Sequence, residues 1–243
     1  MQSAKSYCFF LVFSFSTGFL FYKKEKVLCK MVLDSLLRAF VDNCGLVRTT
    51  ARFIAARSIS PNSLSLLSFF FALLAGVFFF LSRKSTSLTL LLLLAGVFVC
   101  LNALLDGLDG LVAREIGNAN KKGDFLDHVI DRYSDMFIIG GIVFGGYVSW
   151  GIGVIAIVGV LLSSYMGTQA QAVGLNRMYG GLLGRADRIV LIIGATFLML
   201  AYPYQFPASG PLSFSFLGWA IFIFALLCNA TAFQRFVYTW RRL

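Results

Sequence analysis

The stretch that runs from Asp106 to Asp131 reads D-G-L-D-G-L-V-A-R, then eight residues, then G-D-F-L-D-H-V-I-D. It holds two pairs of carboxylates: Asp106 and Asp109 are three residues apart, and Asp127 and Asp131 are four apart. On a helix, residues at these spacings lie on one face. Two such helices packed together would aim four acidic side chains at a common point.

Long apolar segments flank this stretch, so its charges lie at or near a bilayer. Unpaired carboxylates there cost on the order of a few kcal/mol each. Hard divalent ions prefer oxygen ligands, so a divalent metal is the expected partner of the four aspartates. An acidic loop without a ligand is the alternative. The single histidine, His128, lies among the aspartates and is expected to form local hydrogen bonds, because oxygen-ligand sites rarely recruit one imidazole.

The composition predicts an all-α integral membrane protein. Of the 243 residues 58% are hydrophobic, and 26 are phenylalanine, which is more apolar surface than a soluble domain can bury. The net charge of +10 lies beside the apolar segments, as expected for contact with membrane lipids and not for binding of nucleic acid. The five cysteines are odd in number and show no C-x-x-C spacing, which argues against a disulfide framework and a zinc site.

Residues 1–30 are expected to be a dispensable hydrophobic extension, because their apolar run is short for a membrane span and lacks a clear cleavage site. Residues 31–243 form the expected membrane domain. Val32 to Ser58 mixes apolar residues with arginines and predicts an amphipathic helix in the interface, with a solvated helix as the alternative. Pro61 ends that pattern, and Asn62 is expected to cap the next helix.

Six transmembrane helices are expected after this interfacial helix. Their approximate bounds are Ser63–Leu81, Leu88–Leu105, Phe125–Val148, Ile152–Val173, Ile189–Tyr202 and Leu212–Phe233. The Asp106 end of the acidic stretch extends the second span, and the Asp127 end begins the third. From residue 31 onward, nearly all basic residues fall on one side and only Arg83 and Lys84 on the other, which places the aspartates in the cytoplasm of a cell-membrane protein. Gly141-x-x-x-Gly145 in the third span predicts close helix packing.

The acidic stretch resembles, position for position, the signature of the CDP-alcohol phosphotransferase family. The matching residues are Asp106, Asp109, Gly110, Ala113, Arg114, Gly123, Asp127 and Asp131. The resemblance implies a phospholipid-synthesis enzyme that transfers the phosphoryl-linked group of a CDP-lipid to an alcohol and releases CMP. It also implies Mg²⁺ or Mn²⁺, with two ions that neutralise the diphosphate and stabilise the leaving phosphate.

The resemblance assigns roles to the individual residues. Asp106, Asp109 and Asp127 are mainly metal ligands, while Asp131 is the general base and also touches a metal. Gly110, Ala113 and Gly123 are small enough to let a flat nucleotide approach the helix backbone. Ordinary helix packing would also explain these three small residues. Arg114 contacts a phosphate or pairs with a carboxylate. The residues assigned to the CDP-lipid are Pro61, Asn62, Asp109, Gly110, Ala113, Arg114, Gly123 and Asp124.

Arg185 and Arg188 stand three residues apart at the start of the fifth span, which suits a phosphate group on the acceptor, whereas a positive membrane anchor is the alternative. The run from Gly181 to Ile189 resembles that of phosphatidylinositol-phosphate synthases and of the archaeal enzymes that make archaetidylinositol phosphate. Inositol 1-phosphate is therefore the expected acceptor. The chain departs from the bacterial pattern after Tyr165, where Gln169 and its neighbours replace basic residues.

Other functions stay open at this point. The same reaction with glycerol 3-phosphate or serine is one alternative, and a homodimer is implied by the family. A cation transporter would place acidic residues near the middle of several spans, whereas here they cluster at one interface. A membrane scaffold held together by metal would not need Gly110, Ala113 and Arg114 at the spacing of the signature.

Overall fold

The computed structural model describes residues 45–57, 59–83, 85, 87–117, 121–176, 178, 180–206 and 213–243. The extension 1–30 and the first part of the expected interfacial helix lie outside these residues. The described part is all-helical, as predicted, and its elements are α3 (Gly45–Ala56), α4 (Pro61–Ser82), α5 (Leu88–Glu115), α6 (Lys121–Phe144), α7 (Trp150–Ala172), α8 (Arg185–Ala201) and α9 (Phe216–Trp240). Among the described residues the sole β-type pairing is an isolated bridge between Phe206 and Phe214.

The start of α4 differs from the prediction by two residues. Ser60 has extended backbone angles, and its side-chain oxygen accepts a hydrogen bond from the backbone N–H of Ser63 at 3.2 Å. Pro61 occupies the first helical turn, where its missing N–H costs nothing. Ser60 is thus the N-cap, and the expectation that Asn62 caps this helix is wrong because the helix already begins at the proline.

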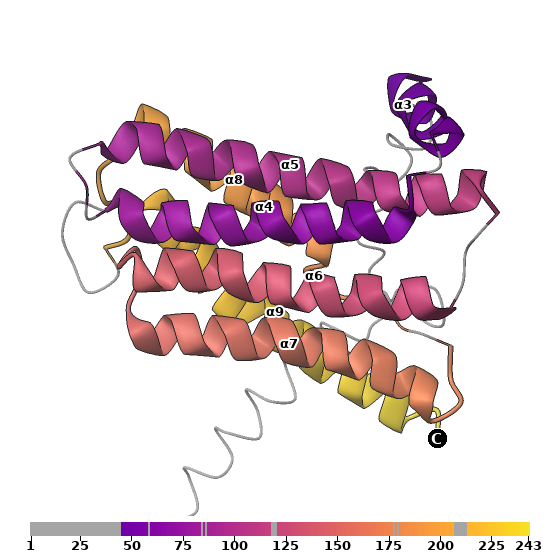
Figure 1. The fold of residues 1–243 in the computed structure, drawn as a ribbon. Coiled ribbons are helices and arrows are strands. Elements are labelled where there is room, and N and C mark those ends of the chain that lie inside the picture. Colours follow the sequence, from indigo (N-terminus) through magenta and orange to yellow (C-terminus); the bar gives the residue numbers. More distant parts are fainter. Residues whose placement is uncertain are drawn as a thin grey trace, which may run out of the picture.

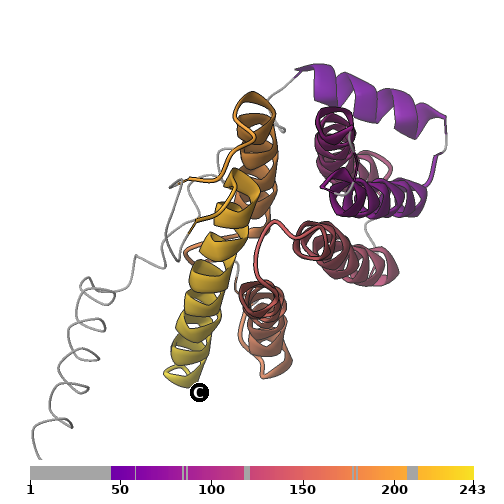
Figure 2. The same ribbon diagram turned by 90° about the vertical axis from the view of Figure 1, so that its left-hand side faces the viewer.

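Helices α4 to α7 run roughly alongside one another, α8 and α9 cross them at an angle, and α3 lies crosswise at one end of the bundle (Figures 1 and 2). Within the bundle α4 packs against α5 and α6, α7 packs against α9, and α8 contacts both α5 and α9. Helix α3 packs on α5. The start of α4, the end of α5 and the start of α6 all lie at the end of the bundle that carries α3 (Figure 1).

Four of the described helices are long and apolar enough to cross a membrane, namely α4, α5, α7 and α9. Helix α8 has 17 residues, and the first half of α6 carries several charges. Large apolar side chains remain exposed on the spanning helices, among them Leu66, Phe70, Leu90, Ile155 and Leu226. An apolar exterior around a helical bundle is the pattern of a membrane protein, because lipid is the solvent that such side chains tolerate.

Helices α4 and α6 touch backbone to backbone. A Cβ atom added to Gly141 would lie 2.2 Å from the carbonyl oxygen of Gly76, and one added to Gly145 would lie 2.7 Å from the carbonyl oxygen of Phe79. Small residues at this spacing allow helices to approach closely in a membrane. The close packing predicted from Gly141 and Gly145 is present, and α4 is the helix that uses it.

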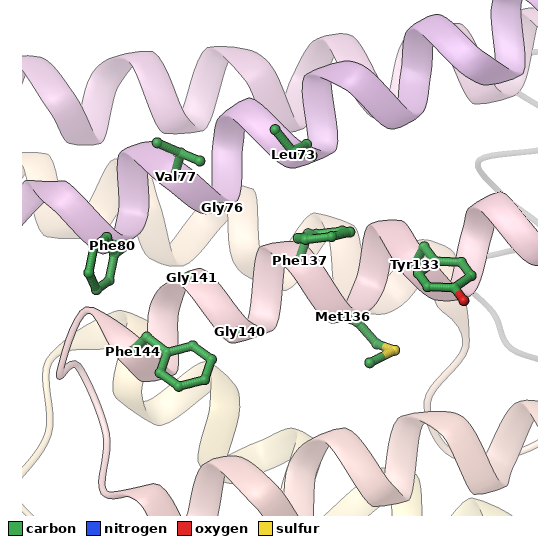
Figure 3. A pocket seen from close by; sticks show the side chains of 10 residues that line it. All are labelled: Leu73, Gly76, Val77, Phe80, Tyr133, Met136, Phe137, Gly140, Gly141 and Phe144. Carbon is green, nitrogen blue, oxygen red and sulfur yellow. The ribbon is translucent and has the colours of Figure 1, made fainter.

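An apolar groove of about 570 Å³ runs along the outside of this contact (Figure 3). Its walls include Leu73 and Phe80 from α4 and Phe137 from α6. Gly140 also lines it and lies about two and a half helical turns beyond Asp131, at about 3.6 residues per turn. The groove and the aspartates therefore occupy opposite faces of α6, so the groove is separate from the acidic site.

Candidate active site

The four aspartates come from the last turns of α5 and the first half of α6. Carboxylate oxygens of Asp106, Asp109 and Asp127 all lie within 4.8 Å of one another. Asp131 belongs to a second such group with Asp127 and His128. Helix α5 continues without a break to Glu115, so Asp106 and Asp109 project from a regular helix. The sequence spacing and the packing of two helices thus bring the predicted aspartates to one place.

Two of these carboxylates are largely removed from solvent, whereas the Asp127 side chain is 37% exposed. Asp109 and Asp131 are each 6% exposed. Asp109 accepts a hydrogen bond of 2.6 Å from the hydroxyl of Ser65 on α4. The Oδ1 atom of Asp106 is buried and has no hydrogen-bond partner among the described residues. A buried carboxylate oxygen without a donor is costly, which suits a position where a cation binds.

Two arginines enter the cluster. Nη1 of Arg185, the first residue of α8, lies 2.6 Å from Asp106 Oδ2 and 2.8 Å from Asp131 Oδ1. Nη1 of Arg132 lies 2.8 Å from the other oxygen of Asp131, and Arg132 Nε donates to the hydroxyl of Ser164 on α7 at 2.5 Å. Each oxygen of the Asp131 carboxylate therefore has its own guanidinium neighbour, which fixes the orientation of the carboxylate.

The charges of this cluster do not cancel when all its carboxylates are ionised. Asp106, Asp109, Asp127 and Asp131 face two guanidinium groups, which leaves two negative charges unbalanced within these residues. All donors are hard oxygens that converge from two helices, the donor set that Mg²⁺ and Mn²⁺ prefer. The residues present therefore fit a divalent metal, and Asp106, Asp109 and Asp127 would hold it.

The residues expected to bind the CDP-lipid surround the same end of the bundle. Pro61 and Asn62 begin α4, Gly110 lies in the last turns of α5, and Gly123 and Asp124 begin α6. A Cβ atom added to Gly110 would meet nothing within 4 Å. The same is true of Gly107, one turn earlier and beside Asp106. Open space next to the aspartates is what a bound nucleotide needs, and helix packing does not explain Gly110.

Ala113 and Arg114 are the remaining residues of α5 that are expected to bind the CDP-lipid. Ala113 is half-buried, and Arg114 is exposed in the last turn of the helix. Asp124 lies near the single histidine, because His128 Nε2 is 3.3 Å from Asp124 Oδ1 and its Nδ1 is 3.9 Å from Asp127 Oδ2. These contacts link His128 to the start of α6 and to the edge of the acidic cluster.

The second predicted acceptor residue lies deeper in the bundle. Arg188 is 6% exposed, and its Nη2 lies 2.6 Å from Asp135 Oδ2 on α6. The Nε atom of Arg188 is buried without a hydrogen-bond partner among the described residues. Arg185 thus reaches the aspartates, whereas Arg188, about one turn further along α8, ties that helix to α6.

Three contacts of the site were not predicted from the sequence. Ser65 binds Asp109, Arg132 binds its own neighbour Asp131, and Ser164 binds Arg132. The sequence does hold a signal for Ser65, which is a hydroxyl residue in an otherwise apolar helix, four residues after Pro61. Helical periodicity gave no signal for Arg132, because adjacent residues on a helix point in different directions and only a long side chain can fold back.

The sequences of known proteins give the family. The family model for CDP-alcohol phosphatidyltransferase matches residues 58–231. The archaetidylinositol phosphate synthase of Pyrococcus horikoshii is 36% identical over 59% of this chain and 72% of its own length. The phosphatidylinositol phosphate synthase of Streptomyces avermitilis is 28% identical over 68% of this chain and 67% of its own length.

Solved structures show the same fold. The phosphatidylinositol phosphate synthase of Mycobacterium tuberculosis with CDP-DAG bound superposes with a TM-score of 0.63, at 23% identity, over 79% of this chain and 92% of that one. The same enzyme in complex with manganese and citrate gives a TM-score of 0.64 at 24% identity, over 79% and 88% of the two chains. The predicted relationship is confirmed by the family model: this chain belongs to the CDP-alcohol phosphatidyltransferase family.

Proposed function

We propose that this membrane enzyme transfers the phosphatidyl-type group of a CDP-lipid to inositol 1-phosphate and releases CMP. The observation that carries the proposal is the position of Arg185, whose Nη1 lies within 2.8 Å of carboxylate oxygens of both Asp106 and Asp131. A guanidinium at this point brings a phosphate-binding group next to the expected general base. An acceptor held by its phosphate at Arg185 would present its hydroxyl close to Asp131.

The charge of the site supports two divalent ions. The acidic cluster with its two arginines carries two excess negative charges, and the diphosphate of a CDP-lipid adds about two more. Two divalent cations, Mg²⁺ or Mn²⁺, would balance this total, with Asp106, Asp109, Asp127 and Asp131 as the ligands. When bound, such ions neutralise the diphosphate and stabilise the leaving CMP. A relative of known structure is described in complex with manganese.

The chain's own residues perform the remaining tasks. Asp131 accepts the proton of the attacking hydroxyl through a carboxylate oxygen, and Arg132 keeps the carboxylate oriented through its contact at 2.8 Å. Ser65 holds Asp109 in place from α4. Burial of these groups keeps water away from the phosphoryl group, which favours transfer to the alcohol over hydrolysis.

The donor would lie at the α5 and α6 side of the cluster. Gly110, Ala113 and Gly123 leave room for the cytidine, while Arg114, Asp124 and the Pro61-Asn62 step surround it. The open space next to Gly107 and Gly110 supports this placement. Another member of the fold is described with CDP-DAG bound.

The identity of the acceptor rests on two supports. Arg185 favours a phosphorylated alcohol, and several relatives bear the names archaetidylinositol phosphate synthase or phosphatidylinositol phosphate synthase. Glycerol 3-phosphate also carries a phosphate and is the main competing acceptor. Serine lacks one and would leave Arg185 without a partner. The absence of basic residues around Gln169 is the feature of the sequence that argues against inositol phosphate.

The proposed arrangement in the membrane is six spans, α4 to α9, with α3 in the interface and the aspartates on the cytoplasmic side. Four helices meet the length and composition of a span, and α6 and α8 lie alongside them in the bundle (Figure 1). The position of α3 across the end that carries the aspartates suits an interfacial helix. We assign residues 31–243 to the catalytic domain and 1–30 to a dispensable extension, and we expect a homodimer.

The decisive experiment incubates purified enzyme with CDP-diacylglycerol or CDP-archaeol and one alcohol at a time, and follows the release of CMP. Inositol 1-phosphate should give the highest kcat/KM, glycerol 3-phosphate a lower one and serine none. The Asp131→Asn variant is the control for background hydrolysis. A preference for serine would contradict the role of Arg185, and the lack of CMP release with any alcohol would contradict the proposed function.

A further inference from the structure

The segment that leads into α8, residues 180–184, is attached to α9 by a buried hydroxyl. The Oγ1 atom of Thr231 accepts hydrogen bonds from the backbone N–H groups of Leu182 and Leu183, at 3.1 and 3.3 Å. The same hydroxyl donates to the carbonyl of Leu227 in its own helix at 2.7 Å. Because its proton is directed along α9, its lone pairs face the segment. Thr231 is fully buried, so water does not compete for these bonds.

A second side chain of α9 holds the same segment from one turn further on. Arg235 Nε donates to the carbonyl of Gly180 at 2.9 Å, and Arg235 Nη1 donates to the carbonyl of Ser163 on α7. The side chain is 8% exposed and lies so close to α7 that a Cβ atom added to Gly167 would be 3.0 Å from Nη1. The planar guanidinium thus joins α7, α9 and the segment in directions that a single ammonium cannot reproduce.

The segment lies directly on the surface of α9. A Cβ atom added to Gly181 would be 2.2 Å from Cγ2 of Thr231, so the backbone passes where only glycine fits. The next polar contact is the backbone N–H of Gly184, which donates to the carboxylate of Asp187 at 2.7 Å and so caps α8. Arg185 follows immediately, and its guanidinium reaches Asp106. A short, well-anchored backbone therefore connects Thr231 to the arginine of the active site.

We propose that Thr231 and Arg235 are positioning residues for the transfer reaction. They fix segment 180–184 on α9 and thereby determine where Arg185 enters the acidic cluster and meets the phosphate of the acceptor. The last step rests on the proposed function, whereas the attachment of the segment rests on the contacts alone. A hydroxyl bonded only within its own helix would be an ordinary helix feature, and Thr196 on α8, also fully buried, donates to Ile192 in that way.

Three variants distinguish a buried threonine that binds segment 180–184 from one that forms a hydrogen bond only within its own helix. Thr231→Val keeps the shape but removes the acceptor of both backbone N–H groups, Thr231→Ser keeps the acceptor, and Thr196→Val is the matched control elsewhere in the bundle. Hydrogen–deuterium exchange of the full-length enzyme in detergent reports on residues 182–188 without any substrate. Thr231→Val should speed exchange there at least about tenfold, while Thr231→Ser and Thr196→Val stay near the wild type.

The kinetic readout distinguishes positioning from a general loss of folded enzyme. Thr231→Val should raise the apparent KM for the phosphorylated acceptor about tenfold, the equivalent of about 1.4 kcal/mol, with the KM for the CDP-lipid within about twofold of the wild type. Arg235→Lys should give a smaller change in the same direction, and Arg235→Gln a larger one. Loss of folded enzyme would lower the rate with both substrates and leave both KM values unchanged.

The proposal is overturned if exchange of residues 182–188 is unchanged in Thr231→Val, or if it rises while the acceptor KM stays constant. It is also overturned if Thr231→Ser behaves like Thr231→Val, since the hydroxyl would then not be the cause. If the wild-type enzyme releases no CMP with any alcohol, the proposed function has failed. The exchange experiment then decides by itself whether Thr231 fixes the segment and the first turn of α8.

Discussion

Arg188 on α8 and Asp135 on α6 form a buried ion pair, with Nη2 and Oδ2 separated by 2.6 Å and both residues less than a tenth exposed. Both charges are largely desolvated, so neither is tolerated without the other. This pair joins the helix that carries Arg185 to the helix that carries Asp127 and Asp131. The relative position of the acidic cluster and its arginine therefore depends on a contact one turn below the site.

The first prediction concerns this pair. Arg188→Gln leaves the Asp135 carboxylate uncompensated, which should destabilise the fold by about 3–5 kcal/mol. The double variant Arg188→Gln with Asp135→Asn should recover most of the thermal stability measured in detergent. If Arg188 instead binds the phosphate of the acceptor, as the sequence alone suggested, Arg188→Gln will keep its stability and raise the acceptor KM, and the double variant will not recover activity.

The second prediction concerns the metal. Asp106→Asn, Asp109→Asn and Asp127→Asn should each reduce CMP release to near background, because each removes one charge from the ligand set. EDTA should abolish the activity of the wild-type enzyme, and Mg²⁺ or Mn²⁺ should restore it. Asp131→Asn should be inactive yet still bind the CDP-lipid, which equilibrium binding of a labelled donor can measure. Full activity in EDTA would exclude the metal.

The third prediction concerns Arg185. Loss of its guanidinium removes a charge-assisted contact worth about 1.5–3 kcal/mol, so Arg185→Gln should raise the apparent KM of the phosphorylated acceptor roughly 10- to 150-fold. Arg185→Lys should recover only part of this, since an ammonium lacks the planar fork. Steady-state kinetics with each substrate varied in turn checks this. An equal loss of affinity for the CDP-lipid would show that Arg185 serves the donor.

The fourth prediction concerns the contact of α4 and α6. Gly141→Ala places a methyl group 2.2 Å from the Gly76 carbonyl oxygen, so the helices must separate, at a cost of about 1–3 kcal/mol. Gly140→Ala is the matched control, because the new methyl group would meet the Phe144 ring at an ordinary contact distance of 3.8 Å. Thermal unfolding in detergent should show a lower midpoint for Gly141→Ala alone. Equal midpoints would mean that the contact is not tight.

The fifth prediction concerns topology. In a variant without native cysteines, Lys121→Cys should react with a membrane-impermeant maleimide only from the cytoplasm, and Ser85→Cys only from outside. The physical basis is the excess of basic residues on the side of the aspartates. The reverse labelling pattern would overturn the orientation and would place the site away from nucleotide-activated substrates.

Much of the architecture follows from local pattern. The apolar runs predict the helices because a chain in lipid must satisfy its own backbone hydrogen bonds, and four of the described helices are long and apolar enough to cross a bilayer. The spacing of Asp106, Asp109, Asp127 and Asp131 predicts their convergence, since periodicity determines which face of a helix a residue occupies. The expected bounds agree with α4 and α7 to within two residues at each end, whereas α9 begins four residues and ends seven residues later than expected. The continuation of α5 past Asp106 agrees with the prediction.

What the sequence left unpredicted depends on contacts between distant segments. Nothing local shows that Arg188 faces Asp135 across two helices, or that Thr231 and Arg235 meet segment 180–184. Arg132 was missed for another reason: a long side chain can bend back to a neighbour that helical periodicity places on a different face. The sequence predicts Asn62 as the cap of α4, although Ser60 and Asn62 are both residue types that cap helices. The choice between them depends on the residue at which the first helical turn begins, and the structure places that residue at Pro61.

The backbone contact between Gly76 and Gly141 also sets the register of α6 along α4. A slip of one residue along a helix moves its side chains by about 1.5 Å, and it would drive backbone atoms of the two helices into one another at this point. The contact lies about 15 Å along α6 from Asp131, yet it holds the α6 aspartates level with Ser65 and its partner Asp109. The packing of α4 against α6 in the apolar part of the bundle thus determines the level at which the α6 carboxylates meet those of α5.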